Sequence, residues 1–160
     1  MKTLGIAVTL KARPILTLAL LEGCASDVQG AAAVEVKDTF EIPLEDRPLA
    51  AQLGEAAKAI RGRVRSLAPD TVVVRRADRP ARASNQEGPR KRLLIEGAVV
   101  AAAYAEVQRT TLLSGKECGQ AYGSDKASLD ELAAGQVNLK YKEAAAAAIA
   151  GLAQAAAGTT

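Results

Sequence analysis

The residues with the clearest chemical potential are the basic side chains of residues 58–92. Eleven Lys and Arg residues and only three Asp and Glu residues lie in this segment, whereas the rest of the chain carries ten basic and fifteen acidic residues. A strongly positive segment on a mildly negative body attracts polyanions or an acidic protein surface. Since arginine presents a fork of N–H donors that matches a phosphate group, nucleic acid is the favoured partner.

The densest positive charge follows a short apolar run at residues 71–74, which predicts a buried strand. Residues 75–91 then contain Pro80, Gly88 and Pro89 and no apolar periodicity. Segments of this length without regular structure are usually functional or disordered. We therefore expect a basic, flexible loop at 75–91. The predicted phosphate contacts in and beside it are Arg75, Arg76, Arg79, Arg82, Arg90, Lys91 and Arg92.

Residues suited to catalysis are scarce. The chain has no His, which removes the commonest general base and zinc ligand. Cys24 and Cys118 lie far apart and have no metal-ligand spacing, and we expect two reduced, buried thiols. Acid neighbours such as Asp130 and Glu131 do not face one site on a helix or strand. These observations predict a protein that is not an enzyme and holds no cofactor.

The N-terminal region has a superficial likeness to a lipoprotein cleavage box at residues 21–24 (LEGC). Lys11, Arg13 and Pro14 interrupt the apolar run before it, and Glu22 lies inside the would-be box. No apolar run approaches the roughly 18 residues needed to span a bilayer. We therefore expect a cytoplasmic protein with no membrane association.

The apolar pattern predicts one α/β domain over residues 1–160, with a mixed sheet flanked by helices on both faces. A charged turn joins the first two strands, and a capping box of Ser128 and Glu131 opens a short helix. Ser114, Gly115 and Lys116 have the spacing of an ordinary turn. Strands are expected at 2–9, 15–21, 33–42, 71–74 and 107–113, and helices at 46–67, 92–106, from 128, and at 140–157.

Five local motifs in this order resemble the RuvC-type Holliday-junction resolvases of the ribonuclease H fold. They are LGI at 4–6, PDTVVV at 69–74, GAVVAAAY at 97–104, GSDK at 123–126 and AAAIA at 146–150. The resemblance covers most of the chain and implies three antiparallel strands followed by alternating helices and parallel strands. It also makes Lys126 a candidate contact to a nucleic-acid backbone.

The chemistry of that family depends on four carboxylates that hold two divalent metals. The matching positions here are Ala7, Arg75, Lys142 and Ala145, and none is acidic. Glu143 is the only acid near the start of the last helix. The resemblance therefore implies a catalytically inactive domain without a metal.

Arg75 and Lys142 carry positive charge at positions where the family has metal-bound acids. One hypothesis is that these two cations hold a phosphate or another anion directly. The alternative is that Arg75 merely ends a strand and points to solvent.

Three functions remain open from the sequence. The first is an inactive module that binds the backbone of duplex or branched DNA, with RNA not separated from DNA. Single strands are disfavoured because no aromatic platform lies near the basic segment. The second is an assembly subunit that forms a homodimer or docks to an acidic protein. The third, an enzyme, is the least favoured.

Overall fold

The computed structural model describes residues 1–23, 34–78 and 87–157. Cys24, Arg79 and Arg82 lie outside the described residues, as does most of the basic segment between the fourth strand and the second helix. Sequence predictions for those residues remain predictions.

The described residues form a five-stranded mixed sheet of order β3-β2-β1-β4-β5. β1 pairs antiparallel with β2, which pairs antiparallel with β3, whereas β1 pairs in parallel with β4 and β4 with β5. The predicted three antiparallel strands followed by parallel ones are confirmed. The strands are β1 (Lys2–Leu10), β2 (Pro14–Glu22), β3 (Glu35–Pro43), β4 (Thr71–Arg76) and β5 (Thr110–Ser114).

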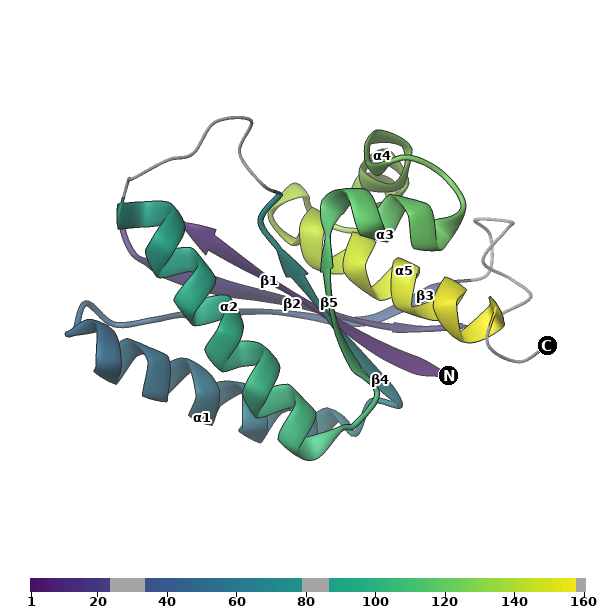
Figure 1. The fold of residues 1–160 in the computed structure, drawn as a ribbon. Helices are drawn as coiled ribbons and strands as arrows, with labels where there is room; N and C mark the ends of the chain where they lie inside the picture. Colours follow the sequence, from purple (N-terminus) through teal and green to yellow (C-terminus); the bar gives the residue numbers. More distant parts are fainter. Residues whose placement is uncertain (24–33, 79–86, 158–160) are drawn as a thin grey trace.

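Helices cover both faces of this sheet, as predicted (Figure 1). One face packs against α1 (Leu49–Leu67) and α2 (Glu87–Glu106). The other packs against α5 (Lys142–Ala157), which lies over β1 and β4. The short helices α3 (Gly115–Tyr122) and α4 (Lys126–Gln136) pack on α5, and the 3-10 turn η2 (Leu139–Tyr141) leads into it.

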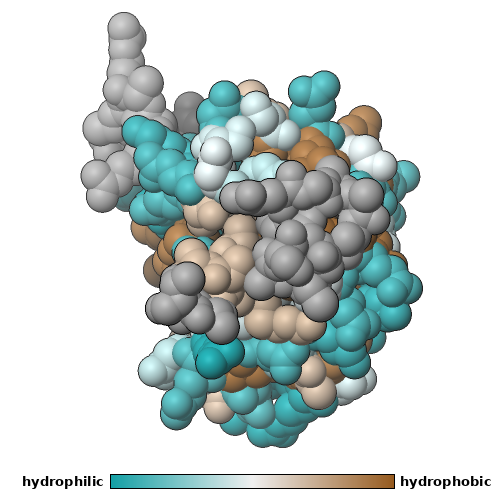
Figure 2. Space-filling view, turned by 90° about the vertical axis from the view of Figure 1, so that its right-hand side faces the viewer, coloured by the Kyte–Doolittle hydropathy of each residue, from teal (hydrophilic) through white to brown (hydrophobic). Residues whose placement is uncertain are grey.

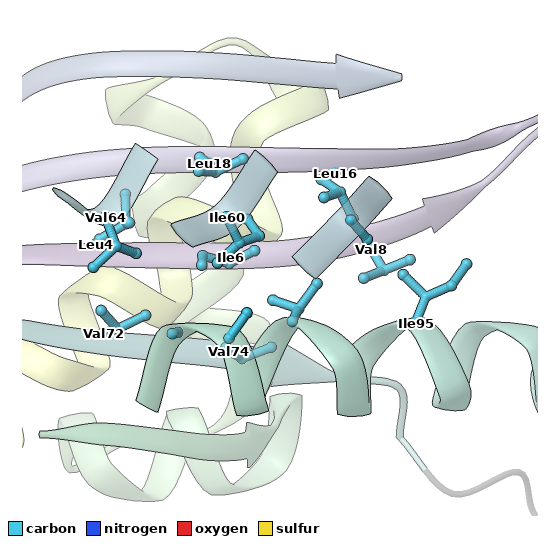
Figure 3. Close-up of a cluster of buried hydrophobic side chains, with 14 of the residues drawn as sticks. Leu4, Ile6, Val8, Leu16, Leu18, Ile60, Val64, Val72, Val74 and Ile95 are labelled. Atoms are coloured by element: carbon cyan, nitrogen blue, oxygen red, sulfur yellow. The ribbon is translucent and has the colours of Figure 1, made fainter. Parts of the chain in front are cut away.

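Large aliphatic side chains fill the space between the sheet and α1 and α2 (Figure 3). Ile60 and Val64 of α1 point toward Leu4 and Ile6 of β1, and all four are at most 1% exposed. Each such side chain stabilises the fold by roughly 1.5–3 kcal/mol relative to its exposed state. This is the larger of the two cores in side-chain volume.

The α5 face is built from alanine and glycine because the helix axis lies very close to the sheet. A Cβ atom at Gly5 of β1 would lie 1.8 Å from the Ala144 carbonyl oxygen of α5. A Cβ atom at Gly151 of α5 would lie 2.6 Å from Val73 Cγ2. Residues 144–150 of α5 are buried throughout. The alanine tract that predicted a helix also permits this contact.

The connection after β4 is shorter than the predicted loop at 75–91. β4 continues through Arg76, because Arg75 and Arg76 pair with Leu113 and Ser114 of β5, and α2 begins at Glu87 rather than Arg92. The connection therefore begins after Arg76 and ends before Glu87.

Helix α3 was not predicted from the sequence, where residues 114–116 suggested an ordinary turn. The Ser114 hydroxyl accepts a hydrogen bond from the Glu117 N–H, and the Glu117 carboxylate accepts one from the Ser114 N–H. This is the capping box of the chain. The N-cap expected at Ser128 is instead Asp125, three residues earlier, and α4 begins at Lys126.

The surface on the side of the N-terminus carries hydrophilic side chains around smaller hydrophobic areas (Figure 2). Within the described ranges, no helix has both the length and the hydropathy that crossing a bilayer requires.

Candidate nucleic-acid interface

Charged side chains from four helices gather where β1 and β4 end. The starts of α2, α3 and α5 lie beside these strand ends (Figure 1). Ala7 of β1 pairs directly with Arg75 of β4 in the parallel register, which brings two of the predicted site positions together. We call this region the charged edge; its described charged residues are Arg75, Arg76, Asp78, Arg90, Lys91, Arg92, Glu96, Glu117, Lys126, Asp130 and Glu143.

Arg75 is buried at the charged edge, with 2% of its surface exposed. Its guanidinium donates two hydrogen bonds to the Asp130 carboxylate of α4, at 2.6 and 3.1 Å. Burial lowers the pKa of Arg75, but the hydrogen bonds and charge of Asp130 outweigh it, so the pKa lies above its ordinary value. Gly115 leaves room for this pair, since a Cβ atom there would lie 2.6 Å from the guanidinium.

This placement corrects both interpretations of Arg75. The side chain does not point to solvent, and Arg75 is not one of the residues that line the cavity of Lys142 described below. Its charge is already compensated by the half-buried carboxylate of Asp130, which the sequence does not place near it. Arg75 is therefore left out of the contacts proposed below.

Two further predicted contacts are paired but accessible. Arg76 donates to Glu117 at 3.0 Å, and Lys126 forms an ion pair with Asp78. The side chains of Arg76 and Lys126 are 26% and 45% exposed. The Lys126 pair is strong enough to lower the pKa of Asp78 despite its partial burial.

Arg92 links α2 to α5 instead of pointing to solvent. Its Nε donates to Glu96 at 2.7 Å, and a terminal N–H donates to Glu143 at 3.5 Å. Glu96 is 1% exposed and also accepts a hydrogen bond from the Ala77 N–H at 3.0 Å. Burial raises its pKa above the ordinary value, and its Oε2 has no hydrogen-bond partner among the described residues. Glu96 thus fixes the residue after β4 to α2.

The remaining predicted positions divide between surface and core. Arg90 is exposed and Lys91 half-buried on the first turns of α2. Ala7 and Ala145 are fully buried on the α5 face. Lys142 lines a cavity of about 570 Å³ on that face. Its lining residues are Thr9, Lys11, Ile15, Thr17, Glu41, Leu139, Lys140, Lys142 and Glu143.

The fold is similar to those of solved Holliday-junction proteins. RuvC from Thermus thermophilus superposes with a TM-score of 0.72 at 17% identity, covering 99% of this chain and 98% of that one. The same protein in complex with a Holliday junction substrate gives 0.68 at 18% identity, covering 99% and 97%. The yeast mitochondrial Holliday junction resolvase Ydc2 gives 0.59 at 16% identity, covering 97% and 80%. No protein-family model and no curated protein matches the sequence.

The chain has a RuvC-like fold. The resemblance found in the sequence motifs is confirmed at the level of fold, and the sheet order with helices on both faces agrees with it.

The RuvC-like fold contradicts the prediction that this chain is not an enzyme. The solved structures that it matches include a resolvase and RuvC bound to a substrate, so the prediction of no activity is not supported. Only four aligned positions and the acids beside them in the chain led to that prediction. In the structure, additional carboxylates lie at the same edge: Asp78 just after β4, Glu96 of α2, Glu117 of α3 and Asp130 of α4.

These carboxylates are engaged by basic side chains. Over residues 1–23, 34–78 and 87–157, no group of three or more His, Cys, Asp or Glu side chains is arranged to hold a metal. Cys118 is buried beside Arg75, and burial raises the pKa of its thiol to about 11. Two spacings in the sequence indicate part of this ion-pair network. They are the capping-box spacing of Ser114 and Glu117 and the i,i+4 spacing of Arg92 and Glu96.

Proposed function

We propose that this chain binds nucleic acid at the charged edge, with branched DNA as the preferred form. The observation that carries the proposal is the similarity in fold to RuvC over 99% of the chain, because one of the matched structures is RuvC in complex with a Holliday junction substrate.

The basic residues of the charged edge support the proposal. Arg90 and Lys91 lie on the first turns of α2, beside the strand ends. Arg76 and Lys126 are paired with partly exposed carboxylates, and such exposed pairs contribute only about 0–1 kcal/mol. A phosphate group can therefore replace the carboxylate at low cost. Arg79 and Arg82 belong to the proposed set on sequence grounds alone.

The experiment is a binding titration of the full chain against a four-way DNA junction, duplex DNA, single-stranded DNA and RNA at several salt concentrations. We expect the junction to bind most tightly. If about four phosphates are contacted, log K falls with log salt at a slope of about −4. Magnesium or manganese in parallel samples measures strand cleavage. Equal, negligible binding of all four nucleic acids at low salt contradicts the proposal.

A charge-reversal variant tests the location. Arg90→Glu with Lys91→Glu should weaken junction binding and make the salt slope less negative by about 2. The matched control is Lys2→Glu with Lys58→Glu, since both lysines are exposed and lie away from the charged edge. An equal loss in both double variants assigns the effect to net charge and contradicts this location.

A second candidate function is assembly as a homodimer, favoured by exposed apolar side chains on α2. Leu93, Leu94 and Tyr104 are 61%, 49% and 55% exposed. They share one side of the helix with Gly97, where no atom lies within 4 Å of an added Cβ. Light scattering after size exclusion at two salt concentrations tests it: a dimer at both, lost in Leu93→Glu with Tyr104→Glu, supports a constitutive dimer, and a monomer at both contradicts it.

A further inference from the structure

The cavity that Lys142 lines lies on the α5 face of the sheet, next to the charged edge. Its floor is formed by Thr9 of β1 and Ile15 and Thr17 of β2, and its wall by η2 and the first turn of α5. Strand alternation puts Thr9 on the same face as Ala7, which belongs to the α5-side core. The cavity therefore opens beside the end of β1.

The charges that line this cavity do not cancel. Lys140 donates to Glu41 at 2.8 Å, and Glu143 is engaged by Arg92 at 3.5 Å. Both carboxylates are thus compensated. Within the described part of the chain, Lys11 and Lys142 form no ion pair, and both residues line the cavity.

The surroundings of Glu41 agree with a positive local field. The hydrogen bond from Lys140, together with the charges of Lys140, Lys11 and Arg13, lowers the pKa of this carboxyl. Lys11 is therefore close enough to act on groups in the cavity. The hydroxyl of Thr17 donates to the Ala7 carbonyl at 3.4 Å, so its one O–H donor is already used. Among the described residues, the Thr9 hydroxyl has no hydrogen-bond partner.

We propose that this cavity is a subsite for one phosphodiester group of the nucleic acid, held by the ammonium groups of Lys11 and Lys142 and by the hydroxyl of Thr9. Lysine binds phosphate as a compact charge that needs no fixed fork geometry. The inference rests on the proposed function and adds residues to it. Lys142 contributes as the sequence suggested, but its partner cation is Lys11 of the β1–β2 turn rather than the buried Arg75.

The first test uses inorganic phosphate alone and does not depend on nucleic acid. Phosphate is titrated into the 15N-labelled full chain at constant ionic strength, with chloride as the comparison anion. We expect saturable amide shifts at Thr9, Lys11 and Lys142 with phosphate. The shifts should disappear in Lys11→Gln with Lys142→Gln and persist in the control Lys58→Gln, which lies on the opposite face of the sheet. Shifts that are absent, or that persist in the double variant, overturn the subsite.

The second test measures junction binding by the same variants. Lys11→Gln with Lys142→Gln should weaken binding at least about tenfold, the loss expected for hydrogen bonds to charged groups. The salt slope should become less negative by about 1–2. Lys58→Gln should change neither quantity. Thermal melting of each variant confirms that the fold is intact.

The two tests separate failure of the subsite from failure of the proposed function. If the wild-type chain binds the junction and the double variant binds it equally tightly with the same slope, the subsite is wrong and the proposed function stands. If the wild-type chain binds inorganic phosphate at these residues but no nucleic acid, the proposed function and the assignment to a phosphodiester are both wrong.

Discussion

The two faces of the sheet are packed against their helices in different ways. The face under α1 and α2 is filled by large aliphatic side chains such as Leu4, Ile6 and Ile60. On the other face, the α5 backbone lies against the backbone of β1 at Gly5, and Gly151 of α5 lies against the side chains of Val73 and Thr3. The first arrangement buries larger apolar side chains, whereas the second leaves no room for an added methyl group between α5 and the sheet. The α5 face ends at the charged edge, so the tighter contact positions the candidate site.

The largest expected effect comes from adding one methyl group on the tight face. Gly5→Ala places a Cβ atom 1.8 Å from the Ala144 carbonyl oxygen and 2.7 Å from the Ala148 nitrogen, both backbone atoms that cannot move aside. We expect a loss of at least about 3 kcal/mol in the free energy of unfolding, or no folded protein. Urea unfolding measures it.

Two substitutions in α1 show whether the effect of Gly5→Ala is specific to the α5 face. Ile60→Val removes one methylene from the α1 face and should cost only about 0.5–1.5 kcal/mol. Gly54→Ala in α1 adds a methyl group where no atom lies within 4 Å, and it should stabilise the helix by roughly 0.5–1 kcal/mol. If Gly5→Ala costs no more than Ile60→Val, the two faces do not differ as described.

The ion pair of Arg75 and Asp130, at the end of the α5 face, should also contribute strongly to the free energy of unfolding. Asp130→Ala leaves the Arg75 guanidinium, 3% exposed, without its carboxylate and should cost about 3–5 kcal/mol. Combining Arg75→Met with Asp130→Ala removes both charges and should recover most of that loss. Single and double variants are compared by urea unfolding. Additive losses would mean that the two side chains are not energetically coupled.

Two glutamates of α2 should give opposite pH dependences. Burial raises the pKa of Glu96 above its ordinary 4.5, so the folded state holds this proton more tightly and stability falls as the pH rises from about 4.5 through the raised pKa. Hydrogen bonds from Arg65 and Arg61 lower the pKa of Glu106, so its contribution is lost as the pH falls below 4.5 through the lowered pKa.

Replacing each residue with glutamine tests these signs. For Glu96→Gln, the fall in stability above pH 4.5 should disappear. For Glu106→Gln, only the acid side of the profile should change, and by less because its partners are exposed. Urea unfolding between pH 3 and 8 measures both. Profiles that change on the same side of pH 4.5 contradict the assignment.

The sequence predicts the fold because its apolar periodicity and alanine tract are local signals. Strand alternation in β1 to β3 and the spacing of Ile60 and Val64 determine which side chains face the core. Helix α3 was missed because its capping box spans Ser114 to Glu117, where a turn explained the local residues equally well.

The candidate site was predicted only in part because its charges pair across long sequence separations. Arg75 and Asp130 are 55 residues apart, and Arg92 and Glu143 are 51 apart. No local pattern reveals such pairs. The sequence alone therefore does not separate basic residues that form internal ion pairs from basic residues that are available to a phosphate. The positive charge of Lys11 was likewise overlooked, since only the folded hairpin brings it to the same cavity as Lys142.

The most direct test of the central claim is a titration of a four-way DNA junction with the full chain, in parallel with Arg90→Glu plus Lys91→Glu and the control Lys2→Glu plus Lys58→Glu. We expect salt-dependent binding that is tighter for the junction than for duplex DNA, weaker in the first double variant and unchanged in the control. Absence of junction binding at low salt, or an equal loss in both variants, would contradict it.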